Sequence, residues 1–268
     1  MKKILATILA CLFLTTTAHA DITTGLIGWW KFEEGGGTIA VDSSGMGNNG
    51  TLVGGPTYVV GKIGSYCLSF NGTSQYVNLG TLGSIGSNIS NVSVSAWVFS
   101  TQNTVTNNVI GTTNSGTTFA QNLSLQVNQN DVGVLLAGSV RSALIDNTTP
   151  LILSGGTNAN NISINTWHLI VATDNSSTNT IVIYVDGVSK AIVYQDQQTP
   201  VTYTNFTSPM LIGAFNKAGT INQFFAGNID DVRIYNRVLS ASDVAQLFLN
   251  HTNIIQGNSI IGGNSIVN

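Results

Sequence analysis

Apolar and polar residues alternate with a period of two along almost the whole chain from residue 21 onward. Successive side chains of a β-strand point to opposite faces, so this alternation predicts strands with one buried face. Polar stretches rich in Gly, Asn, Ser and Thr separate these segments and have the composition of turns. The sequence therefore predicts strands at 26–32, 66–70, 75–79, 92–99, 122–127, 133–138, 167–173, 180–187, 209–215 and 231–235.

One segment, "SASDVAQLFLN", has the period of an amphipathic helix instead. Ser240 is its predicted N-cap and Asp243 follows three residues later, while Val244, Leu247 and Phe248 share one face. Many short strands followed by one late helix predict an all-β fold. We expect an antiparallel two-sheet sandwich or jelly roll with one short C-terminal helix.

The first twenty residues have the pattern of a secretory signal peptide. Lys2 and Lys3 precede an apolar run, and small residues precede an expected cleavage between Ala20 and Asp21. A retained anchor is disfavoured because the apolar run is shorter than the ~20 residues of a membrane span. A lipoprotein box ending at Cys11 is disfavoured because apolar "LFL" follows it. We therefore predict a secreted protein, either extracellular, periplasmic or at the cell surface.

The remaining chain is predicted to form one domain, residues 21–250, followed by a tail, residues 251–268. The tail contains "GNSI" twice, which is too few copies for a repeat architecture. An extra edge strand, a short linker and an assembly contact all remain open for it.

Charge and cysteine content exclude several classes of function. Removing Lys2 and Lys3 leaves seven basic and twelve acidic residues, a net charge of −5 with no basic block. A nucleic-acid partner is therefore not expected, and no later apolar run is long enough to span a bilayer. Cys67 is the single cysteine left, so no intrachain disulfide can form, and its strand pattern predicts a buried thiol.

Several motifs in the same order resemble the LamG-like jelly-roll family of the concanavalin A-like lectin/glucanase superfamily. They are "GLIGWWKFEEGGGTIAVDSSGMGNNGTLVGGPTYVVGKIGSYCLSFNGTSQYVNL", "VSVSAWVF", "INTWHLIVAT", "IVIYVDGVSKA", "MLIGAF" and "GNIDDVRIYNRVLSASDVAQLF". The resemblance covers residues 26–248 and implies a two-sheet jelly roll. This fold carries lectins, glycosidases, adhesion modules and spacers, so the function has to be argued from a site.

Two further features fit such a sandwich. Asp186-Gly187 and Asn71-Gly72 each have the sequence of a two-residue hairpin turn. Six large rings lie on strand patterns and are predicted to fill the space between two sheets: Trp30, Phe32, Phe70, Trp97, Trp167 and Tyr184.

The carboxylates do not have the pattern of a glycosidase. Such an enzyme needs two carboxylates about 5–10 Å apart, and the acidic E-x-D-x-E strand of the superfamily's glucanases is missing. Glu33 and Glu34 are adjacent, as are Asp230 and Asp231, so in a strand each pair points to opposite faces. A cross-strand pair of Glu34 with an aspartate stays open.

Serine hydrolase chemistry is also not indicated. The sequence has no nucleophile-elbow motif, and His168 is predicted to pack or hydrogen-bond at the start of a strand. The chain is therefore predicted not to be an enzyme.

The paired aspartates are instead predicted to have structural roles. In "DDVRIY" the alternation puts Val232 and Ile234 toward the core and Asp230 on the core side at the strand entry. Arg233 falls on the face of Asp231 and is its predicted salt-bridge partner. A carboxylate turned inward has to be paired, hydrogen-bonded or metal-bound.

A structural calcium ion is one way to satisfy Asp230. Asp42 and Asn48 lie in a Gly-rich loop with the hard oxygen ligands that Ca²⁺ prefers, and the resemblance implies a cation in this region. We predict Asp42, Asn48 and Asp230 as ligands, with Glu34 and carbonyls near Gly45. The alternative is an Asx-turn at Asp42 and a strand cap at Asp230.

Candidate ligand residues come from the variable loops. Arg141 is the sole basic residue of the polar stretch 101–165, a later loop contributes Tyr203 and Phe206, and Asn216 follows. Aromatic rings beside planar hydrogen-bonding groups are typical of sugar recognition, although ordinary loop packing is the favoured explanation for any single one of these residues.

Three functions follow from these features. The first is a secreted, non-catalytic, carbohydrate-binding module of the lectin type, with a glycan ligand and a structural Ca²⁺. The second is a structural or adhesive surface protein that binds an extracellular protein or assembles through its tail. The third is a divergent glycoside hydrolase.

Overall fold

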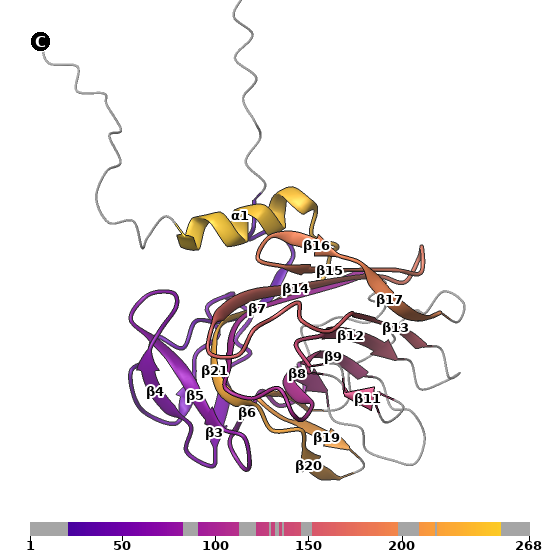
Figure 1. Ribbon diagram of the computed structural model, residues 1–268. Coiled ribbons are helices and arrows are strands. Elements are labelled where there is room, and N and C mark those ends of the chain that lie inside the picture. The colour runs from indigo at the N-terminus through magenta and orange to yellow at the C-terminus, as the bar shows by residue number, and fades with distance from the viewer. Residues whose placement is uncertain are drawn as a thin grey trace, which may run out of the picture.

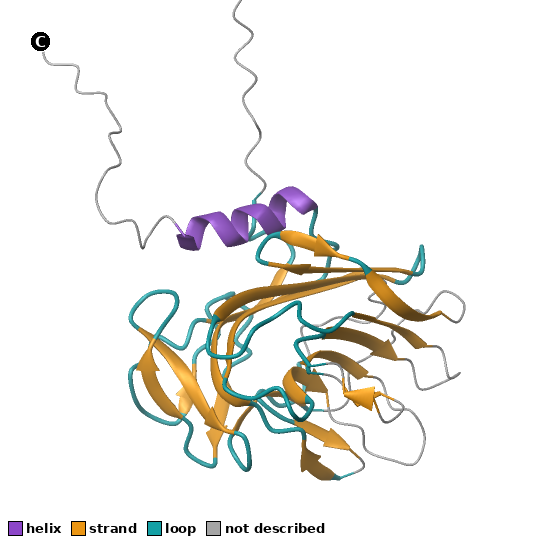
Figure 2. Ribbon diagram, viewed as in Figure 1, coloured by secondary structure: helices purple, strands orange, loops and turns teal. Residues whose placement is uncertain are grey.

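The computed structural model describes residues 21–82, 91–112, 122–128, 130–131, 134–135, 137–145, 152–197, 209–217 and 219–252. Two large antiparallel sheets pack face to face, and a single helix covers the outer face of one of them (Figures 1 and 2). The all-β, two-sheet prediction is therefore confirmed. The predicted signal peptide, the chain beyond Thr252, and the ligand candidates Tyr203 and Phe206 lie outside the described residues.

The first sheet carries the helix on its outer face. Its strands follow the order β16 (Val188–Lys190), β15 (Thr180–Val185), β14 (Trp167–Asn175), β7 (Asn91–Ser100), β21 (Ala226–Tyr235), β5 (Tyr66–Asn71) and β4 (Thr57–Val60), and β1 (Leu26–Trp30) pairs with the second half of β21.

The second sheet forms the other layer of the sandwich. Its order is β17 (Ile192–Gln197), β13 (Ile152–Thr157), β12 (Val140–Ile145), β9 (Asn122–Val127), β8 (Asn107–Thr112), β18 (Met210–Ile212), β6 (Tyr76–Asn78), β3 (Gly50–Val53) and β2 (Ile39–Ala40). Two small ribbons are also present: β10 (Asn130–Asp131) with β11 (Val134–Leu135), and β19 (Phe215–Lys217) with β20 (Thr220–Asn222).

Large rings are divided between two apolar clusters. Trp30, Phe32 and Phe70 lie in the main core between the sheets, as predicted. The prediction is wrong for Trp97, Trp167 and Tyr184, which pack on the outer face of the first sheet beneath the helix. Both faces of β7 and β14 are covered, so their sequence pattern does not reveal which face meets the other sheet.

The helix α1 (Ala241–Thr252) begins with the predicted cap. Asp243 N–H donates to Ser240 Oγ at 3.2 Å, and Ser240 N–H donates to Asp243 Oδ2 at 2.8 Å. This reciprocal pair satisfies two donors at the helix start. The helix includes His251 and Thr252, which were predicted to belong to the tail.

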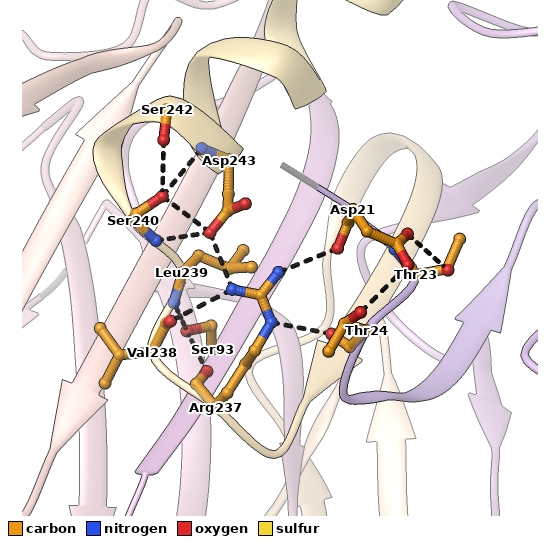
Figure 3. A network of polar contacts seen from close by, with 10 residues as sticks. All are labelled: Asp21, Thr23, Thr24, Ser93, Arg237, Val238, Leu239, Ser240, Ser242 and Asp243. Atoms are coloured by element: carbon orange, nitrogen blue, oxygen red, sulfur yellow. Dashed lines mark hydrogen bonds and ion pairs between the residues drawn. The ribbon is translucent and has the colours of Figure 1, made fainter. Parts of the chain in front are cut away.

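One guanidinium joins the helix start to the beginning of the described chain (Figure 3). Arg237 Nη1 lies 2.7 Å from Asp243 Oδ2, and its Nε–H donates to the Thr24 carbonyl at 2.8 Å. Its Nη2–H also donates to the Asp21 carbonyl at 3.3 Å. The segment 21–24 is therefore held against the N-terminus of α1.

One of the two predicted hairpin turns is confirmed and the other is wrong. Asp186 and Gly187 have φ of 53° and 79° and join β15 to β16, as predicted. Asn71-Gly72 is not a hairpin, because β5 belongs to the first sheet and β6 to the second. Asn71 Oδ1 instead accepts the N–H groups of Thr73 and Ser74, as in an Asx-turn.

Cys67 is buried, as predicted. Burial raises the pKa of its thiol to about 12, with smaller contributions from Asp230 and Glu33. The thiol therefore stays protonated and inert.

A buried carboxyl group links the two sheets. Asp174 on β14 pairs in register with Val92 and Ile181, which belong to the inter-sheet core. Its Oδ2 accepts a hydrogen bond of 2.8 Å from Ser142 on β12 of the opposite sheet. Burial raises the pKa of Asp174 to about 7, and the Ser142 bond opposes this shift.

We expect Asp174→Asn to flatten the pH dependence of stability. The folded protein holds a proton on Asp174 up to about pH 7, whereas the unfolded chain releases it near pH 3.8. The wild-type free energy of unfolding therefore falls as pH rises between these values. Above pH 7.5 the Asn variant should be more stable by a few kcal/mol, roughly 1.4 kcal/mol per pKa unit.

Urea unfolding at pH 4.5 and pH 8 measures this difference. Equal slopes against pH for wild type and variant would contradict the assignment.

Candidate ligand site and the paired aspartates

A β-bulge in β21 changes the direction of the paired aspartates. Asp230 is in register with Trp97, but the register then shifts before Arg233, and Asp231 has a φ of 49°. Ile229 and Val232 consequently both face the main core. The prediction that Asp230 lies on the core side is wrong, because the inserted residue reverses the alternation.

Asp231 is paired as predicted. Its carboxylate lies 3.0 Å from Arg233 Nη2, and its Oδ1 accepts the Trp29 indole N–H at 2.6 Å. The Arg233 guanidinium also lies 4.3 Å from the centre of the Trp29 ring. These contacts fix the end of β1 to the second half of β21.

Asp230 and Glu33 hold one loop from two sides. Asp230 Oδ2 accepts the N–H groups of Lys62 and Ile63 at 2.8 and 2.9 Å, and Glu33 accepts the Ser65 N–H at 2.9 Å. The other Asp230 oxygen is buried, with no hydrogen-bond partner in the described part of the chain.

The pKa of Asp230 is raised to about 8. Burial is the main cause, Asp231 and Glu33 add to it, and the two N–H groups oppose it. The sequence argument that adjacent aspartates face opposite sides does not hold at this bulge. Both side chains nevertheless have structural partners.

The four predicted calcium ligands do not form one group. Asp42 accepts from Trp29 N–H, Ser44 N–H, Ser44 O–H and Asn48 N–H at 2.8–2.9 Å. Glu34 accepts the N–H of Val41, the neighbour of Asp42, at 2.8 Å. Three of the four residues therefore lie around the loop 41–49, whereas Asp230 lies on β21 and binds the separate loop 61–65.

The loop 41–49 is organised by hydrogen bonds to Asp42. Burial acts to raise the pKa of Asp42, but the bonds from Ser44, Asn48 and Trp29 outweigh it and lower the pKa. The Ser44 N–H bond is the Asx-turn considered above. Among described residues, no three His, Cys, Asp or Glu side chains are placed to hold a metal. Calcium binding stays a prediction.

His168 connects a loop to a hairpin. Its Nδ1 lies 2.7 Å from Asp186 Oδ2, and its Nε2 lies 3.0 Å from Ser163 Oγ. No sequence motif predicted this Ser-His-Asp arrangement. Nε2 also accepts the Ser163 backbone N–H at 3.1 Å, which occupies the lone pair that a general base would use. The arrangement therefore anchors the loop.

An open groove of about 480 Å³ lies beside the outer face of the second sheet. Three segments meet there: the turn after β5, the loop before β8, and the chain from β20 toward β21. We call it the rim groove, lined by Gly72, Thr104, Val105, Thr106, Ile221, Asn222, Gln223 and Phe224.

Gln223 is fixed at the base of the rim groove. Its φ is 50°, its carbonyl accepts the Asn108 N–H at 3.0 Å, and its Oε1 accepts the Gln126 amide at 3.2 Å. Gln126 alternates with Leu125 and Val127, which face the core, so it lies on the outer face. Both backbone and side chain of Gln223 are therefore held in place.

Four residues in or beside the lining of the rim groove have an unpartnered amide atom: Asn222 lines the groove, Asn107 and Asn108 follow Thr106, and Asn216 pairs with Ile221. Asn222 Oδ1, Asn216 Oδ1, Asn108 Oδ1 and Asn107 Nδ2 are buried, with no hydrogen-bond partner across the described ranges. Such atoms cost free energy unless water or a ligand satisfies them.

Two predicted ligand residues, Asn216 and Arg141, lie on strands beside this region but not in the groove lining, so their ligand role stays a prediction. Asn216 pairs with Ile221 in the β19–β20 ribbon, and Arg141 is in register with Gln126. Asn222, Gln223 and Phe224 were missed. The pattern "INQFF" runs into β21 and has no loop signature in the sequence.

The model of the concanavalin A-like lectin/glucanases superfamily matches residues 71–245. The chain belongs to this superfamily. Comparison with curated protein sequences finds no match.

Several solved structures share the fold. Domain 4 of an extracellular arabinanase from Geobacillus stearothermophilus, solved with arabinotriose, has a TM-score of 0.59 at 23% identity. The match covers 83% of this chain and 97% of that domain.

Two toxin domains are also similar. The binding domain of Paraclostridial Mosquitocidal Protein 1 has a TM-score of 0.62 at 17% identity. The botulinum neurotoxin serotype D ligand binding domain, solved with N-acetylneuraminic acid, has a TM-score of 0.57 at 19% identity. Each match covers 87% of this chain but 53% of the toxin domain, so the chain spans about half of each. Within the described chain no helix is long and apolar enough to cross a membrane.

We expect Asp230→Ala to loosen the loop 61–65, because two buried N–H groups lose their acceptor. The free energy of unfolding should fall by about 2 kcal/mol, and amide exchange at Lys62 and Ile63 should accelerate. Asp230→Asn keeps an acceptor oxygen and is the matched control. Unchanged exchange in the Ala variant would contradict the role given to Asp230.

The calcium prediction is now specific to the loop 41–49. If it is correct, residues 21–268 should melt at a higher temperature in Ca²⁺ than in EDTA, and Asp42→Ala should abolish the difference. Asp230→Ala should retain it, because Asp230 lies on β21 and binds the loop 61–65 instead. Identical wild-type melting temperatures in Ca²⁺ and EDTA would exclude the ion.

Proposed function

We propose that this chain is a secreted, non-catalytic carbohydrate-binding module that binds a glycan in the rim groove. The observation that carries the proposal is an open groove whose lining holds two adjacent amide side chains, Asn222 and Gln223, beside the Phe224 ring. A sugar hydroxyl both donates and accepts, so it can satisfy an amide oxygen and an amide N–H that lie close together.

The rim groove also has an apolar component. Phe224 is half-buried, and its ring lies 6.5 Å from that of Tyr76, while Val105 is exposed. Sites for small ligands combine such surfaces with a few fixed polar groups. The superfamily supports the proposal, since similar domains have been solved with arabinotriose and with N-acetylneuraminic acid.

A structural or adhesive role is the second candidate. The edge strand β4 ends at Val60, which is 84% exposed, and Tyr66 beside it is 42% exposed. An exposed apolar strand edge can pair with another chain. This role predicts association of the protein without any glycan ligand.

We expect residues 21–268 to retain a subset of oligosaccharides on a glycan array without releasing reducing sugar. Asn222→Ala with Gln223→Ala should weaken binding at least ~10-fold, because two hydrogen-bonding groups are lost. Gln246→Ala removes an amide from α1, on the other sheet, and should leave binding unchanged.

Other outcomes of this screen contradict the proposal in different ways. A folded monomer that binds no glycan contradicts the module, and association in its place favours the adhesive role. Sugar release that is lost on mutation of one carboxylate favours a hydrolase.

A further inference from the structure

The described residues that line the rim groove include no ionisable side chain. Its eight lining residues are glycine, threonine, valine, isoleucine, asparagine, glutamine and phenylalanine. The side chains behind it are neutral as well: Gln126 holds Gln223, and the Gln102 amide donates to Asn107 Oδ1 at 3.1 Å.

Neither Arg141 nor Lys217 is among the residues that line the groove. Arg141 lies on β12 and pairs in register with Gln126, whose side chain holds Gln223. Lys217 pairs with Thr220 at the turn end of the β19–β20 ribbon, whereas Asn222 pairs with Phe215 at the opposite end.

The segments that lie outside the described residues contain almost no charged side chains. Segments 83–90, 113–121, 146–151 and 198–208 contain one charged residue, Asp146, and it is acidic. The chain from residue 21 onward carries a net charge of −5. An acidic sugar would therefore meet no cation in the groove and a negative field around it.

This absence has an energetic consequence for ligand choice. A carboxylate or sulfate that loses water on binding needs an opposite charge or several hydrogen bonds to the anion. A neutral sugar loses only hydroxyl hydration, which amide groups replace.

We infer that the rim groove selects uncharged sugars and rejects their carboxylated counterparts. The inference rests on the proposed glycan-binding function. The Asn222 side chain lines the groove and supplies a neutral amide for a sugar hydroxyl. The Gln223 Nε2 group, whose partner oxygen is already bonded to Gln126, is the donor.

This selectivity is tested by comparing the binding of neutral and acidic sugars, among which the esterified and de-esterified oligogalacturonides form the matched pair. Neutral arabinan and galactan oligosaccharides, and methyl-esterified oligogalacturonides, are compared with de-esterified oligogalacturonides and N-acetylneuraminic acid by calorimetry. We expect neutral ligands to bind at least ~10-fold more tightly, with affinity unchanged between 50 and 500 mM NaCl. Removal of the methyl esters should weaken binding of the oligogalacturonides.

An added cation provides the second test. Thr104 is exposed at the groove, so Thr104→Lys is not expected to disturb folding. It should increase affinity for the acidic ligands several-fold in a salt-dependent manner, whereas Thr104→Gln should not.

The outcomes distinguish a failure of the charge selectivity from a failure of glycan binding itself. Acidic ligands bound as tightly as neutral ones by the wild type, or no gain from Thr104→Lys, would overturn the inference while leaving glycan binding intact. Binding of neither ligand class would overturn the proposed function itself.

Discussion

The pairing of β21 is the constraint on which the rest of the first sheet depends. One edge of β21 bonds to β7, whereas the other bonds first to β5 and then to β1. The bulge at Asp230 and Asp231 lies where one partner gives way to the other. Asp231 holds the end of β1 through Trp29, and Asp230 holds the loop between β4 and β5. Two adjacent carboxylates therefore join three separate parts of the chain.

Sequence patterns correctly predicted the features that neighbouring residues determine. The strand segments, the cap at Ser240 and the turn at Asp186-Gly187 each follow from backbone preferences within a few residues. The Asp231–Arg233 pair was also predictable, because both residues lie on one short strand. The Asn71-Gly72 turn was not, since its role depends on which sheet receives the next strand.

The predictions that were wrong concern features that local sequence patterns do not determine. Alternation reports that a face is covered, but not what covers it, so Trp97 and Tyr184 were placed between the sheets rather than beneath α1. An Asp in the left-handed region gives no glycine signal, so the bulge at Asp231 could not be foreseen. The rim groove was not predicted, because Asn216 and Arg141 lie beside its lining and not in it. Its lining at 221–224 depends on long-range contacts such as Gln126 with Gln223.

The Arg237 network also determines how the module faces its surroundings. It binds segment 21–24 to the start of α1, and α1 lies on the outer face of the first sheet. The rim groove lies beside the outer face of the second sheet, on the far side of the sandwich. Both ends of the described chain therefore leave from the side opposite the groove. A tether attached at either end, to a surface or to another domain, would leave the groove pointing outward and accessible.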